Sequence, residues 1–329
     1  MRMYNGVGAL TAGLLLAVTV TACGTETETV QETMPSGTPE AVEDQAPAAA
    51  PALSVDQAQA VLEEYAEVND QANEALDADL IATVEAGPLL QRSHAGMVAL
   101  RARPESDRGD VVPTQQSNPR YYIPAGVQGW WMAEVTRQGG QELLTFADVG
   151  EGEWRMVSSL TLDEPLPDIE LDEEGWATAV DLADAAGAIA PAEVPGAYED
   201  LWETGAKEAG AVLAETPATE AALEERRANG GDLRLLTRFV AEQPEHPEVY
   251  ALRTADGGSL VVAPLARQRI ETSIVEGSVV TPGTVTALYD DTPRNPVNTY
   301  FRGDAAVWLP AGDEAPRVLA AESAATDAD

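Results

Sequence analysis

The stretch that decides the fold is residues 130–162, WWMAEVTRQGGQELLTFADVGEGEWRMVSSLTL. Three runs within it are rich in aromatic and β-branched residues, which favour strands. Gln138-Gly139-Gly140 and Gly150-Glu151-Gly152 separate the runs and supply the residues that tight turns need. The runs span residues 130–136, 142–148 and 153–162. The stretch therefore predicts an antiparallel meander.

A helical pattern precedes this meander. Ser54 with Gln57 forms a capping-box pattern, and apolar residues then recur every three or four positions up to Leu76. Asp77-Ala78-Asp79 predicts a second helix, which Gly87-Pro88 interrupts. The polar residues 101–120 are interpreted as a loop.

The same order of elements recurs in the second half. A helical stripe over 198–213 precedes a helix that begins after Thr216-Pro217 and ends at Asn229-Gly230-Gly231, and 233–240 is interpreted as a further short helix. Ala255-Asp256-Gly257-Gly258 predicts a hairpin. The strands expected around and after it are 249–254, 259–266, 268–276, 284–289, 297–301 and 305–309. Helices followed by strands, twice, predict an α+β fold of two consecutive modules, each with helices followed by an antiparallel sheet meander.

The N-terminus has the pattern of an export signal. Residues 7–20 are an apolar run, shorter than the ~20 residues of a spanning helix. The run ends in Val20-Thr21-Ala22-Cys23, which resembles the lipobox of bacterial lipoproteins. The resemblance implies cleavage between Ala22 and Cys23, acylation of Cys23 by diacylglycerol and fatty acids such as palmitate, and anchoring on the extracytoplasmic face of the cell membrane. The alternatives are an ordinary signal peptide or an uncleaved anchor.

These patterns divide the chain into consecutive segments. The segment after the signal is acidic and rich in proline and alanine, which is typical of a disordered tether. The last ten residues are interpreted as a frayed polar tail. The segments are a signal peptide (1–22), the tether (23–52), a cone-like α+β module (53–162), an acidic connector (163–196), a second α+β module (197–319) and the tail (320–329).

Charge and composition exclude several classes of partner and cofactor. The chain has 56 acidic and 19 basic residues, a net charge of −37, so nucleic acid and basic-patch docking on anionic lipid are disfavoured. One cysteine rules out a disulfide framework and a multi-cysteine metal site. The acid excess has a separate interpretation as a solvation device for high salt. We expect no metal and no cofactor.

Two stretches of sequence resemble known families. Residues 146–157 resemble the acidic turn and the following Trp-Arg-aliphatic strand of the nuclear-transport-factor-2-like (SnoaL-like) superfamily, which implies a cone-like first module. Residues 53–320 resemble actinobacterial exported lipoproteins of unknown function, a family that brings no assigned catalytic residues. The segments that carry this second resemblance are TVEAGPLLQ (83–91), YYIP (121–124), PLPDIELDEEGWATAV (165–180) and YALRTADGGSLVV (250–262).

Aromatic residues of the first module are the candidate ligand site. On a cone-shaped sheet, alternate side chains face the concave side, so either Trp130 or Trp131 faces a pocket there. The candidate pocket residues are Tyr122, Trp130, Trp131 and Trp154. An apolar ligand or a partner's peptide would fit such a pocket. The alternative is that these rings fill the cone themselves.

Other candidate sites have simpler structural interpretations. The acidic run 163–174 has oxygen ligands for Ca²⁺ but does not match an EF-hand loop, and an extended segment with one solvated face explains it. His94 and His246 lie far apart in sequence, and no serine has a nucleophile-elbow motif around it, so neither histidine is assigned a catalytic role.

The function predicted from these features is a non-enzymatic, membrane-anchored lipoprotein that binds a ligand or an envelope protein at the cell surface. The alternative is a small-molecule hydrolase or isomerase that uses the cone pocket with a carboxylate as the base. A polar pocket with a buried acid would favour the enzyme, and a pocket plugged by tryptophan would favour binding.

Overall fold

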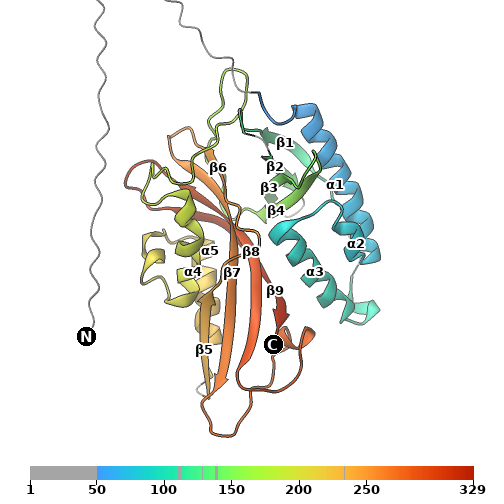
Figure 1. Ribbon diagram of the computed structural model, residues 1–329, viewed down its shortest axis with the longest axis vertical. Coiled ribbons are helices and arrows are strands. Elements are labelled where there is room, and N and C mark those ends of the chain that lie inside the picture. The colour runs from blue at the N-terminus through green and yellow to red at the C-terminus, as the bar shows by residue number, and fades with distance from the viewer. Residues whose placement is uncertain (1–49, 110–112, 128, 138–139, 233) are drawn as a thin grey trace, which may run out of the picture. The chain divides into compact units, whose positions relative to one another are not determined.

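The computed structural model describes residues 50–109, 113–127, 129–137, 140–232 and 234–329, and these described residues form one compact unit (Figure 1). The predicted signal peptide and all but the last residues of the predicted tether lie outside the described residues.

The first half has helices followed by a four-stranded antiparallel sheet in the order β1-β2-β3-β4. Ser54 and Gln57 form the predicted capping box at the start of α1. The helices are α1 (Val55–Ala75), α2 (Ala78–Ile81), α3 (Gly87–Arg101) and the 3₁₀ turn η1 (Glu105–Asp107). The strands are β1 (Ser117–Tyr122), β2 (Trp130–Arg137), β3 (Gly140–Asp148) and β4 (Trp154–Thr161).

The second half repeats this order with a five-stranded antiparallel sheet, β5-β7-β8-β9, in which β6 also pairs with β7. Its helices are α4 (Val194–Glu203) and α5 (Pro217–Asn229), with 3₁₀ turns η2 (Pro191–Glu193), η3 (Ala209–Val212) and η4 (Thr286–Leu288). Its strands are β5 (Leu235–Ala241), β6 (Tyr250–Arg253), β7 (Ser259–Ser273), β8 (Val297–Leu309) and β9 (Arg317–Ala328). The predicted α+β class, with helices preceding sheet meanders, is confirmed.

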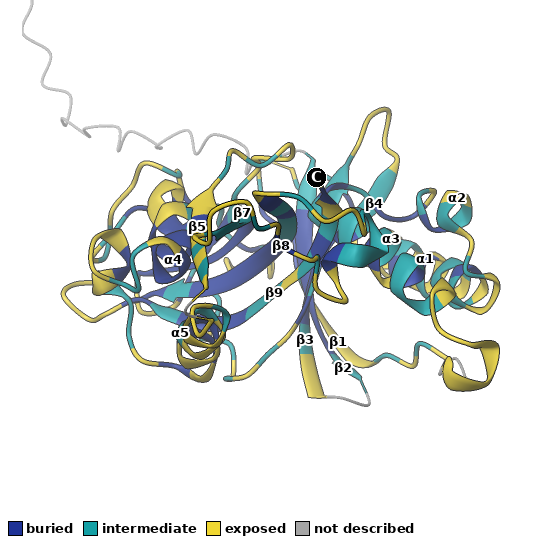
Figure 2. Ribbon diagram, turned by 90° about the horizontal axis from the view of Figure 1, so that it is seen from below, coloured by how far each residue is buried: buried dark blue, intermediate teal, exposed yellow. Residues whose placement is uncertain are grey.

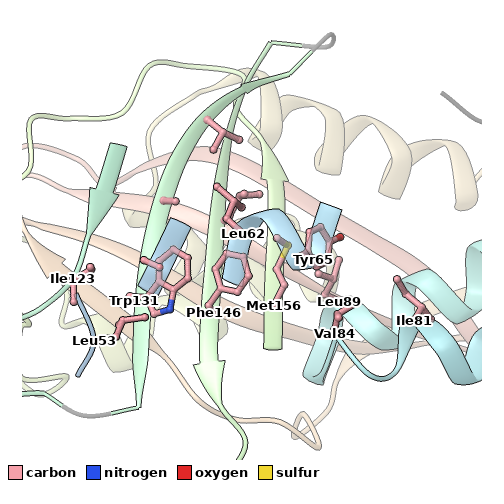
Figure 3. Packing of buried hydrophobic residues seen from close by; sticks show 14 of the residues in the cluster. Leu53, Leu62, Tyr65, Ile81, Val84, Leu89, Ile123, Trp131, Phe146 and Met156 are labelled. Atoms are coloured by element: carbon pink, nitrogen blue, oxygen red, sulfur yellow. The ribbon is translucent and has the colours of Figure 1, made fainter. Parts of the chain in front are cut away.

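Each sheet buries both faces because its strands carry apolar residues on both sides. On the first sheet, one face packs on α1 and α3, and Figure 3 shows Trp131, Phe146 and Met156 beside Leu62 and Tyr65. On the second sheet, the outer face packs on α4 and α5. Figure 1 shows α1 to α3 on one outer side and α4 and α5 on the other, with the sheets between them.

The remaining faces of the two sheets form a third core between them. Alternation along β2 sends Trp131 toward the helices and Met132 toward the second sheet. Alternation along β7 likewise sends Val261 toward α4 and Leu260 and Val262 toward the first sheet. Figure 2 shows buried residues concentrated in the strands, with exposed residues on the outer sides of the helices. The layers therefore run helices, sheet, sheet, helices.

The acidic connector 163–196 lies against both sheets. Ala177 bridges to Pro124 of the first half, and Ala179 bridges to Leu252 of β6. Ala177 is also part of the core between the sheets.

A β-bulge in β4 changes which face its side chains occupy. Phe146 pairs with Met156 and Thr145 pairs with Ser158, so Val157 is an extra residue without a partner on β3. Met156 consequently packs toward the helices, while Leu160 belongs to the core between the sheets. Ser158 faces the second sheet in the same way, where it meets Asp304.

Several predicted elements were wrong. Residues 235–241 form β5 rather than a helix, because the segment pairs along its length with β7. Residues 320–328 are part of β9 rather than a frayed tail, because their backbone pairs with β8. The predicted strand near 284–289 contains the turn η4, and the strands on either side of it are longer than expected. The predicted interruption at Gly87-Pro88 is instead the start of α3.

Candidate functional site

The first sheet divides the four predicted pocket residues between its two faces. Trp131 is fully buried on the helix side and stacks on Phe146, with ring centroids 4.2 Å apart. Trp154 is half-buried and packs against the same cluster. Tyr122 and Trp130 lie on the opposite face, toward the second sheet. The four rings therefore do not surround one cavity.

Of these four residues, Trp130 lines a cavity of about 390 Å³ at the junction of the two sheets. Ala147 and Val157 of the first sheet contribute to its wall, and Val262 and Pro264 contribute from β7. Gly87 and Pro88 at the start of α3 close another side. Most of the lining is therefore apolar, and it comes from segments far apart in the sequence.

A gap beside β7 makes room for this cavity. β6 pairs with β7 as far as Val262, and β5 resumes the pairing at Arg267. Between these points the chain leaves the sheet edge over 243–249 and brings His246 and Glu248 to the cavity. Pro264 lies within the gap, where its missing N–H removes no bond to a strand on that side.

A buried acid lines the cavity. Asp304 of β8 is 1% exposed, and its Oδ1 accepts a hydrogen bond from the Ser158 hydroxyl at 2.5 Å. Within the described part of the chain, its Oδ2 accepts no hydrogen bond and lies 3.4 Å from Nη2 of Arg92. Burial raises the pKa of Asp304 to about 6, while Arg92 and the Ser158 hydrogen bond oppose this shift.

Arg92 of α3 joins the two sheets beside this acid. It donates to the Ser159 carbonyl of β4 at 2.8 Å and pairs with Glu322 of β9. Glu322 in turn accepts from the Thr161 backbone at 3.2 Å. Asp304 therefore has one cation close by, held on the side of α3.

Two aromatic rings meet at the cavity. Trp130 and Tyr250 lie with centroids 5.4 Å apart and planes tilted by 53°. Burial, and to a lesser extent the charge of Glu248, raise the pKa of Tyr250 above its usual value. The cavity thus offers aromatic surface together with a buried carboxylate.

The other residues considered from the sequence lie elsewhere. Nε2 of His94 lies 3.2 Å from the Ala78 carbonyl, whereas His246 is exposed at the cavity. In the acidic run, Asp172 accepts hydrogen bonds from the backbone of Glu174 and Trp176. Among the described residues, no group of three or more histidine, cysteine or acidic side chains is placed to hold a metal ion.

Sequence reasoning missed Asp304, Ser158 and Tyr250. A charged residue inside the apolar stretch GDAAVWL (303–309) was the available signal for Asp304, since an acid in a buried strand needs a partner. Its partner Ser158 is 146 residues away and occupies the right face only because of the bulge.

Comparisons with known proteins agree with the predicted lipoprotein family. The model of the family "Domain of unknown function (DUF8094)" matches residues 49–329. An uncharacterized lipoprotein of Streptomyces coelicolor is 30% identical over 84% of this chain and 82% of its own length. A second from that organism is 29% identical over 71% and 73%, and one from Streptomyces avermitilis is 26% identical over 78% of each chain.

No solved structure matches the chain. Within the described residues, none of the helices has the length and apolar character to cross a membrane. The family match covers most of the chain, and the first relative reaches 30% identity over most of both proteins. The chain therefore belongs to the DUF8094 family, a domain of unknown function, and its relatives in Streptomyces are uncharacterized lipoproteins.

Proposed function

We propose that this protein is a membrane-anchored extracytoplasmic lipoprotein whose folded part binds a small, largely apolar ligand in the cavity between its sheets. The observation that carries the binding role is the cavity itself. Its volume, about 390 Å³, lies within the ~300–1,000 Å³ of small-molecule sites. Its apolar wall, with a few polar groups, is the usual lining of such sites.

The anchor rests on Cys23 and on the relatives. Cys23 follows Ala22 in a lipobox-like sequence, and the three relatives bear the name lipoprotein. Residues 24–50 would join Cys23 to the folded part, and a chain of this length spans at most roughly 90–100 Å. The anchor would hold the folded part near the membrane while leaving the cavity accessible.

Replacement of the proposed lipid attachment residue tests the anchor. Cells that express the wild-type chain or Cys23→Ser are labelled with an alkyne-tagged palmitate analogue and separated into membrane and soluble fractions. We expect label, cleavage and membrane association for the wild type, and neither label nor cleavage for Cys23→Ser. Mass spectrometry that finds an unmodified, uncleaved wild-type chain contradicts the anchor.

A neutral apolar fluorescent probe, N-phenyl-1-naphthylamine, tests the cavity. Ala147→Phe places a ring in the cavity wall, and Ala60→Phe places one on the exposed side of α1 as a matched control. We expect saturable binding with one site in the wild type and in Ala60→Phe, and at least tenfold weaker binding in Ala147→Phe. Equal binding by all three proteins would show that the probe does not use this cavity.

An enzymatic role is the second candidate, and Asp304 is the observation that favours it. A buried carboxylate with a raised pKa at a cavity wall has the character of a general base. Its test is hydrolysis of small p-nitrophenyl esters by the wild type and by Asp304→Asn. Hydrolysis by the wild type that is lost in Asp304→Asn, with an unchanged circular dichroism spectrum, favours the enzymatic role. A wild-type rate equal to that in buffer alone contradicts it.

The nuclear-transport-factor-2-like cone stays a prediction for the first half. Its support is the order of elements, with α1 to α3 preceding the antiparallel sheet β1-β2-β3-β4.

A further inference from the structure

We propose that the ligand of this cavity carries a cationic amine or ammonium group on an apolar body, with Asp304 facing the charge and the rings of Trp130 and Tyr250 packing on the body. This inference rests on the proposed function, because it names the class of ligand for the same cavity.

The charges of the cavity wall have one sign. Glu248 and Asp304 contribute carboxylates, and none of the described lining residues is lysine or arginine. His246 lies at the exposed edge of the wall. The chain as a whole has a net charge of −37, which adds to the negative potential at the cavity. An anionic ligand would therefore be repelled, and a cation would be attracted.

Asp304 has acceptor capacity that the protein does not use. An ionised carboxylate accepts several hydrogen bonds, and a buried one that accepts few is costly. Among the residues that the structure describes, Oδ1 of Asp304 accepts a hydrogen bond from Ser158, whereas Oδ2 accepts none. Arg92 lies 3.4 Å from Oδ2, beyond a good charge-assisted hydrogen bond. An ammonium group in the cavity would supply the missing donor.

The aromatic corner suits the same ligand. Trp130 and Tyr250 pack on each other at the cavity wall with their planes tilted by 53°, so an apolar body beside the pair contacts both rings. The faces of tryptophan and tyrosine also attract cations, which strengthens the preference for a positive head over a neutral one. Arg92 lies outside the cavity wall and partly neutralises the negative charge of Asp304. The alternative result of the test is therefore that the cavity binds neutral ligands equally well.

Three probes that share a phenyl ring on a short carbon chain but differ in their polar group test whether the cavity prefers a cationic ligand. They are 2-phenylethylamine, 2-phenylethanol and phenylacetate, and each displaces N-phenyl-1-naphthylamine from the full chain at pH 7.5. We expect the amine to displace the dye at a concentration at least tenfold lower than the alcohol, and phenylacetate to be the weakest. The advantage of the amine should shrink in 0.5 M NaCl because salt screens the attraction.

Acid-to-amide variants locate the effect. Asp304→Asn should reduce the affinity for 2-phenylethylamine to that for 2-phenylethanol, and it should leave the affinity for 2-phenylethanol unchanged. Asp313→Asn, at an exposed position outside the described cavity wall, is the matched control and should behave as the wild type. Glu248 is exposed at the cavity, so Glu248→Gln provides a second test if Asp304→Asn does not fold. This variant should weaken the binding of 2-phenylethylamine two- to threefold.

The outcomes separate the two proposals. A dye that binds in the cavity, with amine and alcohol equally effective in every variant, overturns the cationic ligand and leaves the binding function standing. A dye that binds equally to wild type and Ala147→Phe, together with an amine that shows no saturable heat in calorimetry, overturns both.

Discussion

Asp304 links the chemistry of the cavity to the stability of the fold. The pKa of an aspartate in an unfolded chain is about 4, whereas burial raises that of Asp304 to about 6 in the folded protein. Between these values the folded state binds more protons, so the free energy of unfolding falls as pH rises. The loss is complete above pH 6 and amounts to about 3 kcal/mol for this group alone. The charged groups that face it are Arg92 of α3 and Glu322 of β9.

We therefore expect the difference in stability between wild type and Asp304→Asn to depend on pH. Urea unfolding between pH 4 and 7.5 should show the wild type losing up to about 3 kcal/mol relative to the variant as pH rises. Burial also raises the pKa of Glu199, to about 7. Its effect on stability is the same in both proteins and therefore cancels in their difference. Asp313→Asn is the control, and parallel curves for wild type and Asp304→Asn would contradict the prediction.

Residues whose partners are local were predictable. Ser54 and Thr216 cap their helices because the backbone N–H groups they bind lie three residues away. Strand alternation indicated that Trp130 and Trp131 face opposite sides of the sheet, and it left open which of the two faces a pocket. The contact between Ser158 and Asp304 was not predictable, because the two residues are 146 positions apart and meet only through the packing of the two sheets.

At the scale of elements, the bulge in β4 places one extra residue, Val157, opposite β3. Deleting Val157 would leave a regular ladder in which Met156 still pairs with Phe146 and Ser158 still pairs with Thr145, so Ser158 and Leu160 would keep the face toward the second sheet. We expect a loss of about 2–3 kcal/mol, because the buried Val157 side chain is lost while Leu160 and the Ser158–Asp304 hydrogen bond remain.

Val157→Ala is the matched control for this deletion. It keeps the extra residue and removes two methyl groups, so we expect a loss of about 1–2 kcal/mol. The measurement is the midpoint of urea unfolding for the two variants. A loss above ~4 kcal/mol for the deletion would contradict this, because it would show that Ser158 and Leu160 had left the face toward the second sheet.

Elements that depend on long-range pairing were the ones predicted wrongly. The apolar run at 233–240 is short, and its composition does not distinguish helix from strand. β9 is rich in alanine, which has low strand propensity, so its sequence indicated a frayed end. Pairing with β7 and β8 decides both cases, and neither pairing is visible in the local sequence.

At the scale of the whole molecule, the core between the sheets makes the two halves dependent on each other. Met132, Leu143 and Leu160 are fully buried against the second sheet. We expect the chain to unfold in one transition in calorimetry, with equal calorimetric and van't Hoff enthalpies. The fragment 53–162 exposes those residues and should give a collapsed NMR spectrum, whereas a dispersed spectrum or two separated transitions would contradict this dependence.

The acid excess belongs to the same scale. A net charge of −37 produces self-repulsion that salt screens, so the unfolding midpoint should rise steeply up to ~0.2 M NaCl. A further rise up to molar salt is expected if the charge serves solvation in high salt, and a flat response over the whole range would rule that interpretation out.

The core between the sheets also governs how the chain is made. Strands β2 to β4 leave the ribosome or a translocation channel long before their partners on β6 to β8, which follow about 90 to 150 residues later. At synthesis rates of about 5–20 residues per second, the apolar face of the first sheet stays exposed for roughly 5–30 seconds before the second sheet can pack on it. We therefore expect nascent chains that end before β6 to aggregate more readily than chains that extend beyond β8.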